Sequence, residues 1–218
     1  LKTIEEPPSH IVFILATTEF HKVPETVVSR CQHFVFRKPT EEVLKRLVVQ
    51  TAKKEGYDID HDAISLIAML GDGSFRDTHG ILDKIITSCE SGHITRRDVE
   101  NLTGAPSQKF AEKFIEAIIT RNLDTGLSVV GEAVRENIDI KVFIKLILRT
   151  LRMGMLLAYS PSFAETFKEQ YSEDEWRFLE KVKNETGKKV NSQLLLAFLE
   201  AYEQTDSATI QSLPLELA

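Results

Sequence analysis

The sequence predicts a mostly α-helical protein in which a short α/β segment comes first. After Pro39, apolar residues recur at helical spacing along most of the chain. Before Pro39, residues 10–17 form one continuous apolar run, which is the pattern of a buried parallel strand. We therefore expect the remnant of an α/β domain over residues 1–38, a helical domain over 39–104 and an all-α domain over 105–218.

Short elements are expected on both sides of the apolar run. Pro24 suits the first position of a short helix that would run to about Arg30, and residues 33–36 have the composition of a second strand. Residues 1–6 resemble the last turns of a helix that the two following prolines would stop. Because no Met or capping residue precedes those turns, we expect the chain to begin inside a domain, as a fragment of a longer protein would.

The middle segment carries the signals of short, capped helices. Asp60, Ser74 and Thr95 are placed to cap three helices, and the last two are each followed by an aspartate three residues on. The apolar positions at helical spacing in this segment are Val43, Leu44, Leu47, Val48, Ile64, Ile67, Ala68, Ile81, Leu82, Ile85 and Ile86. Residues 103–106 contain Gly and Pro and are expected to form a linker.

The last segment is expected to be a helical bundle without chemistry of its own. Ser172 and Glu175 form a capping-box signal before one helix. The most apolar stripe is Val142, Phe143, Leu146, Ile147, Leu151 and Met155. Such a stripe serves equally as an internal core or as an interface between subunits, and the sequence leaves both interpretations open.

Composition excludes several classes of function. The net charge is −6 and no segment is strongly basic, so any contact with DNA must be local or shared with other subunits. Cys31 and Cys89 cannot build a disulfide framework or a four-ligand zinc site, which favours a reduced, cytoplasmic setting. The six histidines show no metal-ligand spacing, and no apolar run approaches the roughly 20 residues that span a bilayer. We therefore expect no metal site and no membrane contact.

Arg30 is the first candidate for a functional residue. It ends the short helix that follows the apolar run, and a planar guanidinium is always charged and suits phosphate oxygens. From there it could reach a nucleotide held by a neighbouring protein. The alternative is structural, because a cation at a helix C-terminus complements the helix dipole.

Thr18 and Arg76 are the other candidates. Thr18 follows the apolar run, where a hydroxyl at the carboxyl end of a parallel strand can bind a γ-phosphate, although it could simply begin a turn. Arg76 lies in the first turn of a predicted helix, where the dipole disfavours a cation and attracts an anion. The alternative to anion binding is that Arg76 is an exposed arginine paired with Asp72 or Asp77.

Taken in order, these motifs resemble the gamma/tau subunits of the bacterial DNA polymerase III clamp loader, a family of AAA+ ATPases. The resemblance covers the whole chain and is most specific in the first 40 residues. The residues that carry it are Leu1-Lys2-Thr3-Ile4-Glu5-Glu6-Pro7-Pro8, Phe13-Ile14-Leu15-Ala16-Thr17-Thr18-Glu19, Lys22-Val23-Pro24, Ser29-Arg30-Cys31-Gln32, Gly73-Ser74-Phe75-Arg76-Asp77 and Leu213-Pro214-Leu215-Glu216-Leu217.

The resemblance implies a domain assignment and a role for each candidate residue. Residues 1–38 would be the end of the AAA+ ATPase domain, 39–104 the helical lid and 105–218 the collar that holds the oligomer together. Thr18 would be the first sensor of the γ-phosphate and Arg76 the second, carried on the lid. Arg30 would be the arginine finger that acts on ATP in the next subunit.

The resemblance also implies cofactors and partners for the full-length protein. ATP and Mg²⁺ would be its cofactors, and its partners would be delta, delta-prime, further gamma/tau copies, the sliding clamp and primer-template DNA. No G-x-x-x-x-G-K-[ST] phosphate loop occurs in these residues, so we expect no bound cofactor and no ATP hydrolysis from this chain alone. The phosphate loop and a Cys-rich zinc module would lie upstream.

Two other functions and some departures from the family pattern accompany this interpretation. A non-hydrolysing scaffold subunit of the delta-prime type would also donate an arginine finger. Another AAA+ protein, such as a Holliday-junction helicase or a replication initiator, should carry a basic DNA-binding module after the lid, which the acidic final segment lacks.

Phe20 and Thr78-His79-Gly80 depart from the residues usual in the family and leave Thr18, Arg30 and Arg76 intact.

Overall fold

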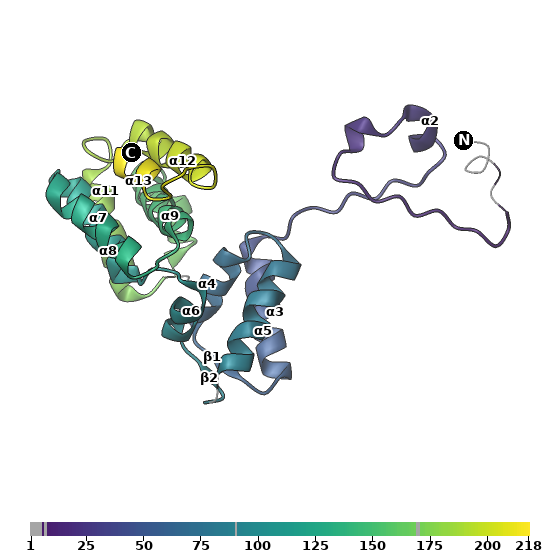
Figure 1. Ribbon diagram of the computed structural model, residues 1–218, viewed down its shortest axis with the longest axis horizontal. Coiled ribbons are helices and arrows are strands. Elements are labelled where there is room, and N and C mark those ends of the chain that lie inside the picture. Colours follow the sequence, from purple (N-terminus) through teal and green to yellow (C-terminus); the bar gives the residue numbers. More distant parts are fainter. Residues whose placement is uncertain (1–5, 7, 90, 169–170) are drawn as a thin grey trace. The chain divides into compact units, whose positions relative to one another are not determined.

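The structure is a computed structural model, and it describes residues 6, 8–89, 91–168 and 171–218. It divides into two compact units, Leu1–Lys38 and Pro39–Ala218. The described residues are mostly helical, which confirms the predicted fold class (Figure 1). The predicted helix end at residues 1–6 lies, apart from Glu6, outside the described residues.

The unit Leu1–Lys38 contains two short helical elements, η1 (Phe20–Lys22) and α2 (Glu25–Val28). The prediction of strands at residues 10–17 and 33–36 is wrong for this structure, because neither segment forms a strand. A strand is stabilised by hydrogen bonds to a neighbouring strand, and the described part of this unit provides none. The apolar side chains of both segments are accordingly exposed to solvent, up to 94% at Phe36.

The helices of residues 39–104 enclose a first apolar cluster. They are α3 (Glu41–Lys54), α4 (His61–Leu70), α5 (Phe75–Ser88) and α6 (Arg96–Thr103). Two strands that the sequence did not predict, β1 (Asp58–Ile59) and β2 (His93–Ile94), pair in parallel beside them. The cluster includes Val48, Ile67, Leu82 and Ile85, all of which are buried.

The helix starts in this segment follow the predicted caps. The Ser74 side chain accepts a hydrogen bond from the Asp77 backbone N–H. Thr95 and Asp98 form the full reciprocal capping box, and the hydrogen bonds from Thr95 hold the pKa of Asp98 below its usual value. Asp60 occupies the N-cap position, but its side chain accepts no capping hydrogen bond. Local sequence therefore defines where these helices begin.

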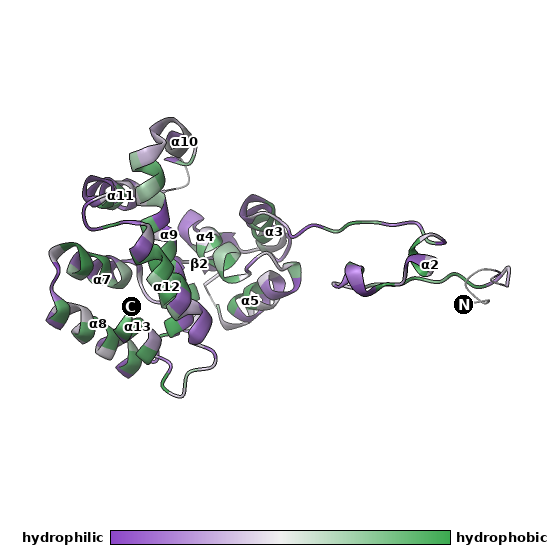
Figure 2. Cartoon of the chain, turned by 90° about the horizontal axis from the view of Figure 1, so that it is seen from above, coloured by the Kyte–Doolittle hydropathy of each residue, from purple (hydrophilic) through white to green (hydrophobic). Residues whose placement is uncertain are grey.

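The remaining helices gather around α9 (Ile140–Tyr159) (Figure 1). They are α7 (Gln108–Thr120), α8 (Leu123–Arg135), α10 (Pro161–Glu165), α11 (Glu173–Glu185), α12 (Ser192–Gln204) and α13 (Leu213–Leu217). Ser172 and Glu175 form the predicted capping box at the start of α11. Figure 2 shows that several of these helices are hydrophobic on one side and hydrophilic on the other, as packing around a shared core requires.

The apolar stripe on α9 is an internal core. Phe143, Ile147 and Leu151 are completely buried within the chain, among side chains of α7, α8, α11 and α12. Leu146 packs against both this cluster and the cluster of α3–α6. Helix α9 is therefore the element that joins the two apolar clusters of the unit Pro39–Ala218.

Candidate functional site

The Arg30 guanidinium folds back onto its own helix. Its Nη1 donates a hydrogen bond to the Thr26 carbonyl oxygen at 2.7 Å and another to Ser29 Oγ at 3.3 Å. A cation that binds the last carbonyls of a helix complements the dipole, which is the structural role considered for this residue. The side chain is nevertheless exposed, so it also lies where a neighbouring protein could meet it.

Thr18 lies in a bend immediately before η1 and is exposed. The hydroxyl that organises this bend belongs to the preceding residue, because Thr17 Oγ1 accepts a hydrogen bond from the Glu19 N–H at 3.0 Å. Thr18 and Arg30 belong to the unit Leu1–Lys38, whereas Arg76 belongs to the unit Pro39–Ala218. The structure brings no two of the three predicted residues into contact within a unit.

Arg76 is the second residue of α5, and its side chain is exposed. It forms no hydrogen bond or ion pair with any residue that the structure describes. The sequence left open a pairing with Asp72 or Asp77, and neither pair is formed. An unpaired guanidinium in the first turn of a helix lies beside backbone N–H groups that also favour an anion. This arrangement is suited to binding a phosphate group.

The turn that leads into α5 has a closely specified backbone. Asp72 and Gly73 both have positive φ angles, 48° and 76°. An added Cβ at Gly71 would lie 2.0 Å from Thr78 Oγ1, so only glycine fits there. Thr78 is completely buried and its hydroxyl donates to the Ser74 carbonyl at 2.8 Å. The first turn of α5 is thereby packed directly against the turn before it.

Lys145 of α9 anchors the same turn from the other side. Its Nζ donates to the Met69 carbonyl oxygen at 2.9 Å and to Asp72 Oδ1 at 2.7 Å. The Met69 carbonyl is in the last turn of α4, where the helix dipole favours a cation. The residue that could have paired with Arg76 is therefore engaged by a lysine 73 positions away in sequence.

One turn further along α9, Arg149 binds the start of α3. Its two terminal nitrogens bind the two carboxylate oxygens of Glu41 at 3.1 and 2.9 Å, a bidentate arrangement. Burial disfavours the charge of Arg149, but the charges and hydrogen bonds of Glu41 and Tyr171 together more than offset this, so the pKa of Arg149 is raised. Lysine and arginine on α9 thus hold the α3–α5 region at two points.

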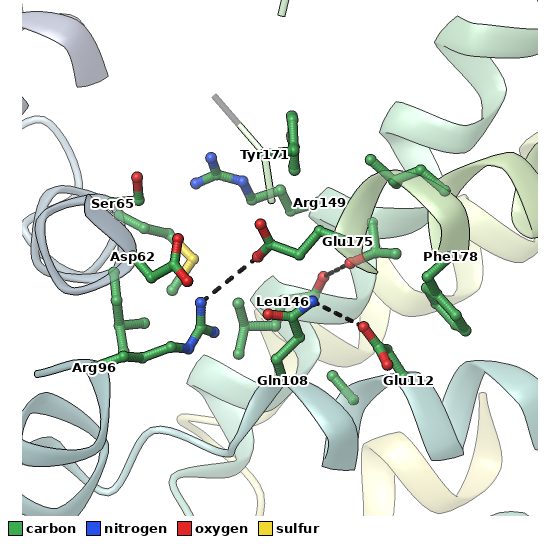
Figure 3. Close-up of a pocket in the computed structure, with 15 residues that line it drawn as sticks. Asp62, Ser65, Arg96, Gln108, Glu112, Leu146, Arg149, Tyr171, Glu175 and Phe178 are labelled. Carbon is green, nitrogen blue, oxygen red and sulfur yellow. Dashed lines mark hydrogen bonds and ion pairs between the residues drawn. The ribbon is translucent and has the colours of Figure 1, made fainter. Parts of the chain in front are cut away.

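A cavity of about 80 Å³, lined by both apolar and charged side chains, lies beside these contacts, between α4, α6, α7, α9 and α11 (Figure 3). Arg96, which lines this cavity, forms an ion pair with Glu100 at 2.8 Å and lies 3.7 Å from Glu175, another lining residue. Ser65 Oγ is buried there without a hydrogen-bond partner among the described residues. Pockets for drug-sized ligands and cofactors usually measure about 300–1,000 Å³. The space is therefore too small for a nucleotide.

Glu112 is the carboxylate of this cavity whose ionisation is perturbed. Burial raises its pKa, and nearby Glu175, Glu116 and Asp174 act in the same direction. Its Oε1 accepts a hydrogen bond from Gln108 Nε2 at 2.8 Å, which lowers the pKa in part. The ionised carboxylate is consequently less favourable in the folded protein than in the unfolded chain.

Sequence reasoning did not identify Lys145, Arg149 or Glu41. The contacts of Lys145 and Arg149 span 73 and 108 positions, and no local pattern encodes such distances. One signal was present, because Lys145 and Arg149 are spaced four residues apart and so share a face of α9.

The described residues include no group of three or more His, Cys, Asp or Glu side chains that could hold a metal. They also include no helix long and apolar enough to cross a membrane.

Known proteins match parts of this chain. Residues 1–40 match a family model described as DNA polymerase III, delta subunit. The Bacillus subtilis (strain 168) DNA polymerase III subunit tau is 36% identical over 140 residues, which are 64% of this chain and 24% of that protein. The Mycoplasma genitalium subunit gamma/tau is 36% identical over 132 residues, which are 61% of this chain and 22% of that protein.

A third relative and one solved structure complete the comparison. The Salmonella typhimurium subunit tau is 31% identical over 139 residues, 64% of this chain and 22% of that protein. A Bacillus subtilis DNA clamp loader delta protein has 18% identity and a TM-score of 0.40, covering 99% of this chain and 67% of that one. The chain is homologous to DNA polymerase III gamma/tau subunits over 61–64% of its length, which confirms the predicted resemblance. It spans about a quarter of the length of these relatives.

Proposed function

Because the chain is homologous to gamma/tau subunits, we propose that it is part of an ATP-driven motor subunit of the bacterial DNA polymerase III clamp loader. Such a subunit helps to place the ring-shaped sliding clamp on primed DNA during replication. The observation that carries the proposal is the 36% identity to the Bacillus subtilis tau subunit over 140 residues. Residues 1–38 would close the ATPase domain, 39–104 would form the lid and 105–218 the collar.

Arg76 would contact the γ-phosphate of ATP bound in its own subunit. Two features of the described residues support this role. The guanidinium is exposed and unpaired, and it lies in the first turn of α5, where backbone N–H groups favour an anion. The described residues contain no group of three or more His, Cys, Asp or Glu side chains that could hold a metal, and we assign no step to Mg²⁺ here.

Thr18 and Arg30 would act on the nucleotide from the ATPase domain, Thr18 in its own subunit and Arg30 in the next one. Both side chains are exposed in the unit Leu1–Lys38. The present hydrogen bond of Arg30 to the Thr26 carbonyl is compatible with such a role, because an exposed guanidinium can exchange one acceptor for another. Arginine fingers of other NTPases accelerate hydrolysis by roughly 10³–10⁵-fold.

The collar role of residues 105–218 is supported by apolar side chains that remain uncovered in the single chain. Leu123 on α8, Leu196 on α12 and Leu217 on α13 are 62–78% exposed. Association with other subunits would cover apolar side chains that a single chain leaves exposed. The partners proposed here are delta, delta-prime and further gamma/tau copies, with the sliding clamp and primer-template DNA engaged by the assembled loader.

The test is Arg30→Ala in the full-length subunit assembled with its partners. The variant should lose clamp-stimulated ATP hydrolysis, because the next subunit's site lacks its transition-state cation. Binding of ATP by its own subunit should be nearly unchanged. Arg37→Ala is the matched control, because Arg37 is another exposed arginine of the same unit. A loader that carries this variant should hydrolyse ATP normally. Normal hydrolysis by the Arg30→Ala loader would contradict the arginine-finger assignment.

A second candidate is a non-hydrolysing scaffold subunit of the delta-prime type. The match of residues 1–40 to a model described as DNA polymerase III, delta subunit, favours it. Nucleotide binding by the full-length subunit separates the two. Tight, Mg²⁺-dependent ATP binding that Arg76→Ala weakens supports the motor subunit, whereas no detectable binding supports the scaffold.

A further inference from the structure

We infer that Lys145 is a positioning residue for Arg76. By holding the turn between α4 and α5, it fixes the direction in which α5 presents the Arg76 guanidinium to a phosphate group. The inference rests on the function proposed for Arg76. It adds that a residue of the collar segment sets the affinity of the lid for nucleotide.

The first step is the double anchor on the turn. Lys145 Nζ binds a backbone acceptor, the Met69 carbonyl, and a side-chain acceptor, Asp72 Oδ1, at 2.9 and 2.7 Å. The two acceptors lie on either side of the end of α4. A single ammonium that joins both therefore defines the path of the chain as it leaves the helix.

The second step is the rigidity of the connection from Asp72 to Arg76. Gly73 has a positive φ angle, and Ser74 caps α5 through the Asp77 N–H. Thr78 bonds the Ser74 carbonyl and is completely buried. Because Asp72 leads into this capped and packed first turn, a displacement of Asp72 should move the first turn of α5, and Arg76 with it.

The third step is that the Lys145 contact contributes little to the free energy of folding, so its main effect is on the position of the turn. Lys145 and Asp72 have side-chain exposures of 25% and 66%, and ion pairs near the surface contribute roughly 0–1 kcal/mol. Arg76 has no partner of its own among the described residues, so the start of α5 alone determines where it points. Removal of Lys145 should therefore affect phosphate contact more than folding.

The experiment measures the affinity of the full-length subunit for a non-hydrolysable ATP analogue. Lys145→Met removes the ammonium and keeps the side-chain length, and Lys145→Arg keeps a cation. Asp72→Asn removes the charge of the acceptor while suiting the left-handed backbone there. Lys113→Met, which breaks the surface pair with Glu132 at 3.0 Å, is the matched control. Thermal unfolding of each variant checks that it is folded.

Lys145→Met should weaken binding about threefold to tenfold, the usual size of coupling between neighbouring residues. Asp72→Asn should weaken it in the same direction, Lys145→Arg should restore most of the affinity, and Lys113→Met should leave it unchanged. In an Arg76→Ala background, Lys145→Met should have no further effect, because Lys145 acts through Arg76.

Two results would overturn the inference, and they are distinguishable from failure of the proposed function. If Arg76→Ala weakens binding but Lys145→Met does not, Lys145 has no positioning role. If Lys145→Met weakens binding equally with and without Arg76, it acts by another route. If Arg76→Ala itself leaves the affinity unchanged, the proposed role of Arg76 fails and the inference falls with it.

Discussion

Arg76 and Lys145 are two cations beside the same turn, at opposite helix ends. The Lys145 ammonium lies at the C-terminus of α4, where the dipole attracts a positive charge and the Met69 carbonyl accepts a hydrogen bond from it. Arg76 lies at the N-terminus of α5, where a cation is disfavoured by about 0.3–1 kcal/mol. Asp72, the carboxylate that could have compensated Arg76, is bound by Lys145 instead. Asp77 places one acidic side chain in this turn, and a phosphate group would add the direct ion pair that Arg76 does not form with any described residue.

Glu112 provides a prediction about stability and pH. A carboxyl whose pKa is raised on folding stabilises the protein below its unfolded pKa, near 4.5, and loses this contribution as pH rises through the higher folded value. At neutral pH the ionised, partly buried carboxylate is therefore destabilising. We expect Glu112→Gln to raise the unfolding temperature at pH 7, because the amide keeps the acceptor for Gln108 and removes the charge.

The control for this prediction is Glu116→Gln, one turn further along α7. Glu116 is 47% exposed and bound to Lys181, so its replacement removes one acidic charge and one surface ion pair from the same helix without relieving a buried charge. The benefit of Glu112→Gln should exceed that of the control at pH 7 and shrink as the pH falls toward 4. An equal benefit at both pH values would contradict the assigned role of burial.

The start of α5 yields a prediction at the scale of a structural element. Gly71→Ala should destabilise the protein by roughly 1–3 kcal/mol, the usual cost of an overpacked core position. The added Cβ would lie 2.0 Å from Thr78 Oγ1, and Thr78 is buried and hydrogen-bonded, so it cannot move aside. Chemical denaturation of the variant measures this loss directly.

Gly80, within α5, is the matched control, and here we expect replacement by alanine to increase stability. A Cβ added there meets no atom within 4 Å, and its φ angle is an ordinary helical one. Gly80→Ala should therefore stabilise the protein by about 0.5–1 kcal/mol through helix propensity alone. Destabilisation by Gly80→Ala, or tolerance of Gly71→Ala, would show that the packing described for this turn is wrong.

Whether an element could be predicted from sequence depended on whether its determinants are local. The caps at Ser74, Thr95 and Ser172 place their partners three residues away, and these helices begin where the sequence predicted. The strands expected at residues 10–17 and 33–36 need neighbouring strands, and the described residues of their unit supply none. Strands β1 and β2 have only two residues each and show no period to detect.

The same distinction applies to the candidate site. The position of Arg76 in the first turn of a helix could be predicted, because the cap that starts this helix is local. The absence of a described partner for Arg76 could not be predicted, because it depends on Asp72 binding Lys145, which lies 73 residues away in the sequence. The hydrogen-bonded ion pair between Arg149 and Glu41 could not be predicted either, because its two residues lie 108 positions apart. Long-range polar contacts of this kind require the folded arrangement of α9.

At the scale of the whole molecule, α9 contributes to both apolar clusters of the compact unit Pro39–Ala218. Its apolar stripe fills one cluster through Phe143 and Ile147, and Leu146 reaches the other. Lys145 and Arg149, on the same helix, bind the turn after α4 and the start of α3. The sequence divides this region into a lid and a collar, but the contacts of α9 connect them, and the boundary at residue 104 stays a prediction.

A protein comprising residues 39–218 should therefore fold without the first 38 residues. The described residues of the unit Leu1–Lys38 expose most of their apolar side chains, and the apolar clusters of residues 39–218 contain no side chain from this unit. Limited digestion of the 218-residue chain with trypsin should cut first after the exposed residues Lys22, Arg30 and Arg37 and leave a resistant helical product. The shortened protein should show one cooperative thermal transition within about 2–4 °C of the full chain, the shift that about 1 kcal/mol produces at this size. Early cleavage inside α3–α9, or two separate transitions, would show that α9 does not unite the two clusters.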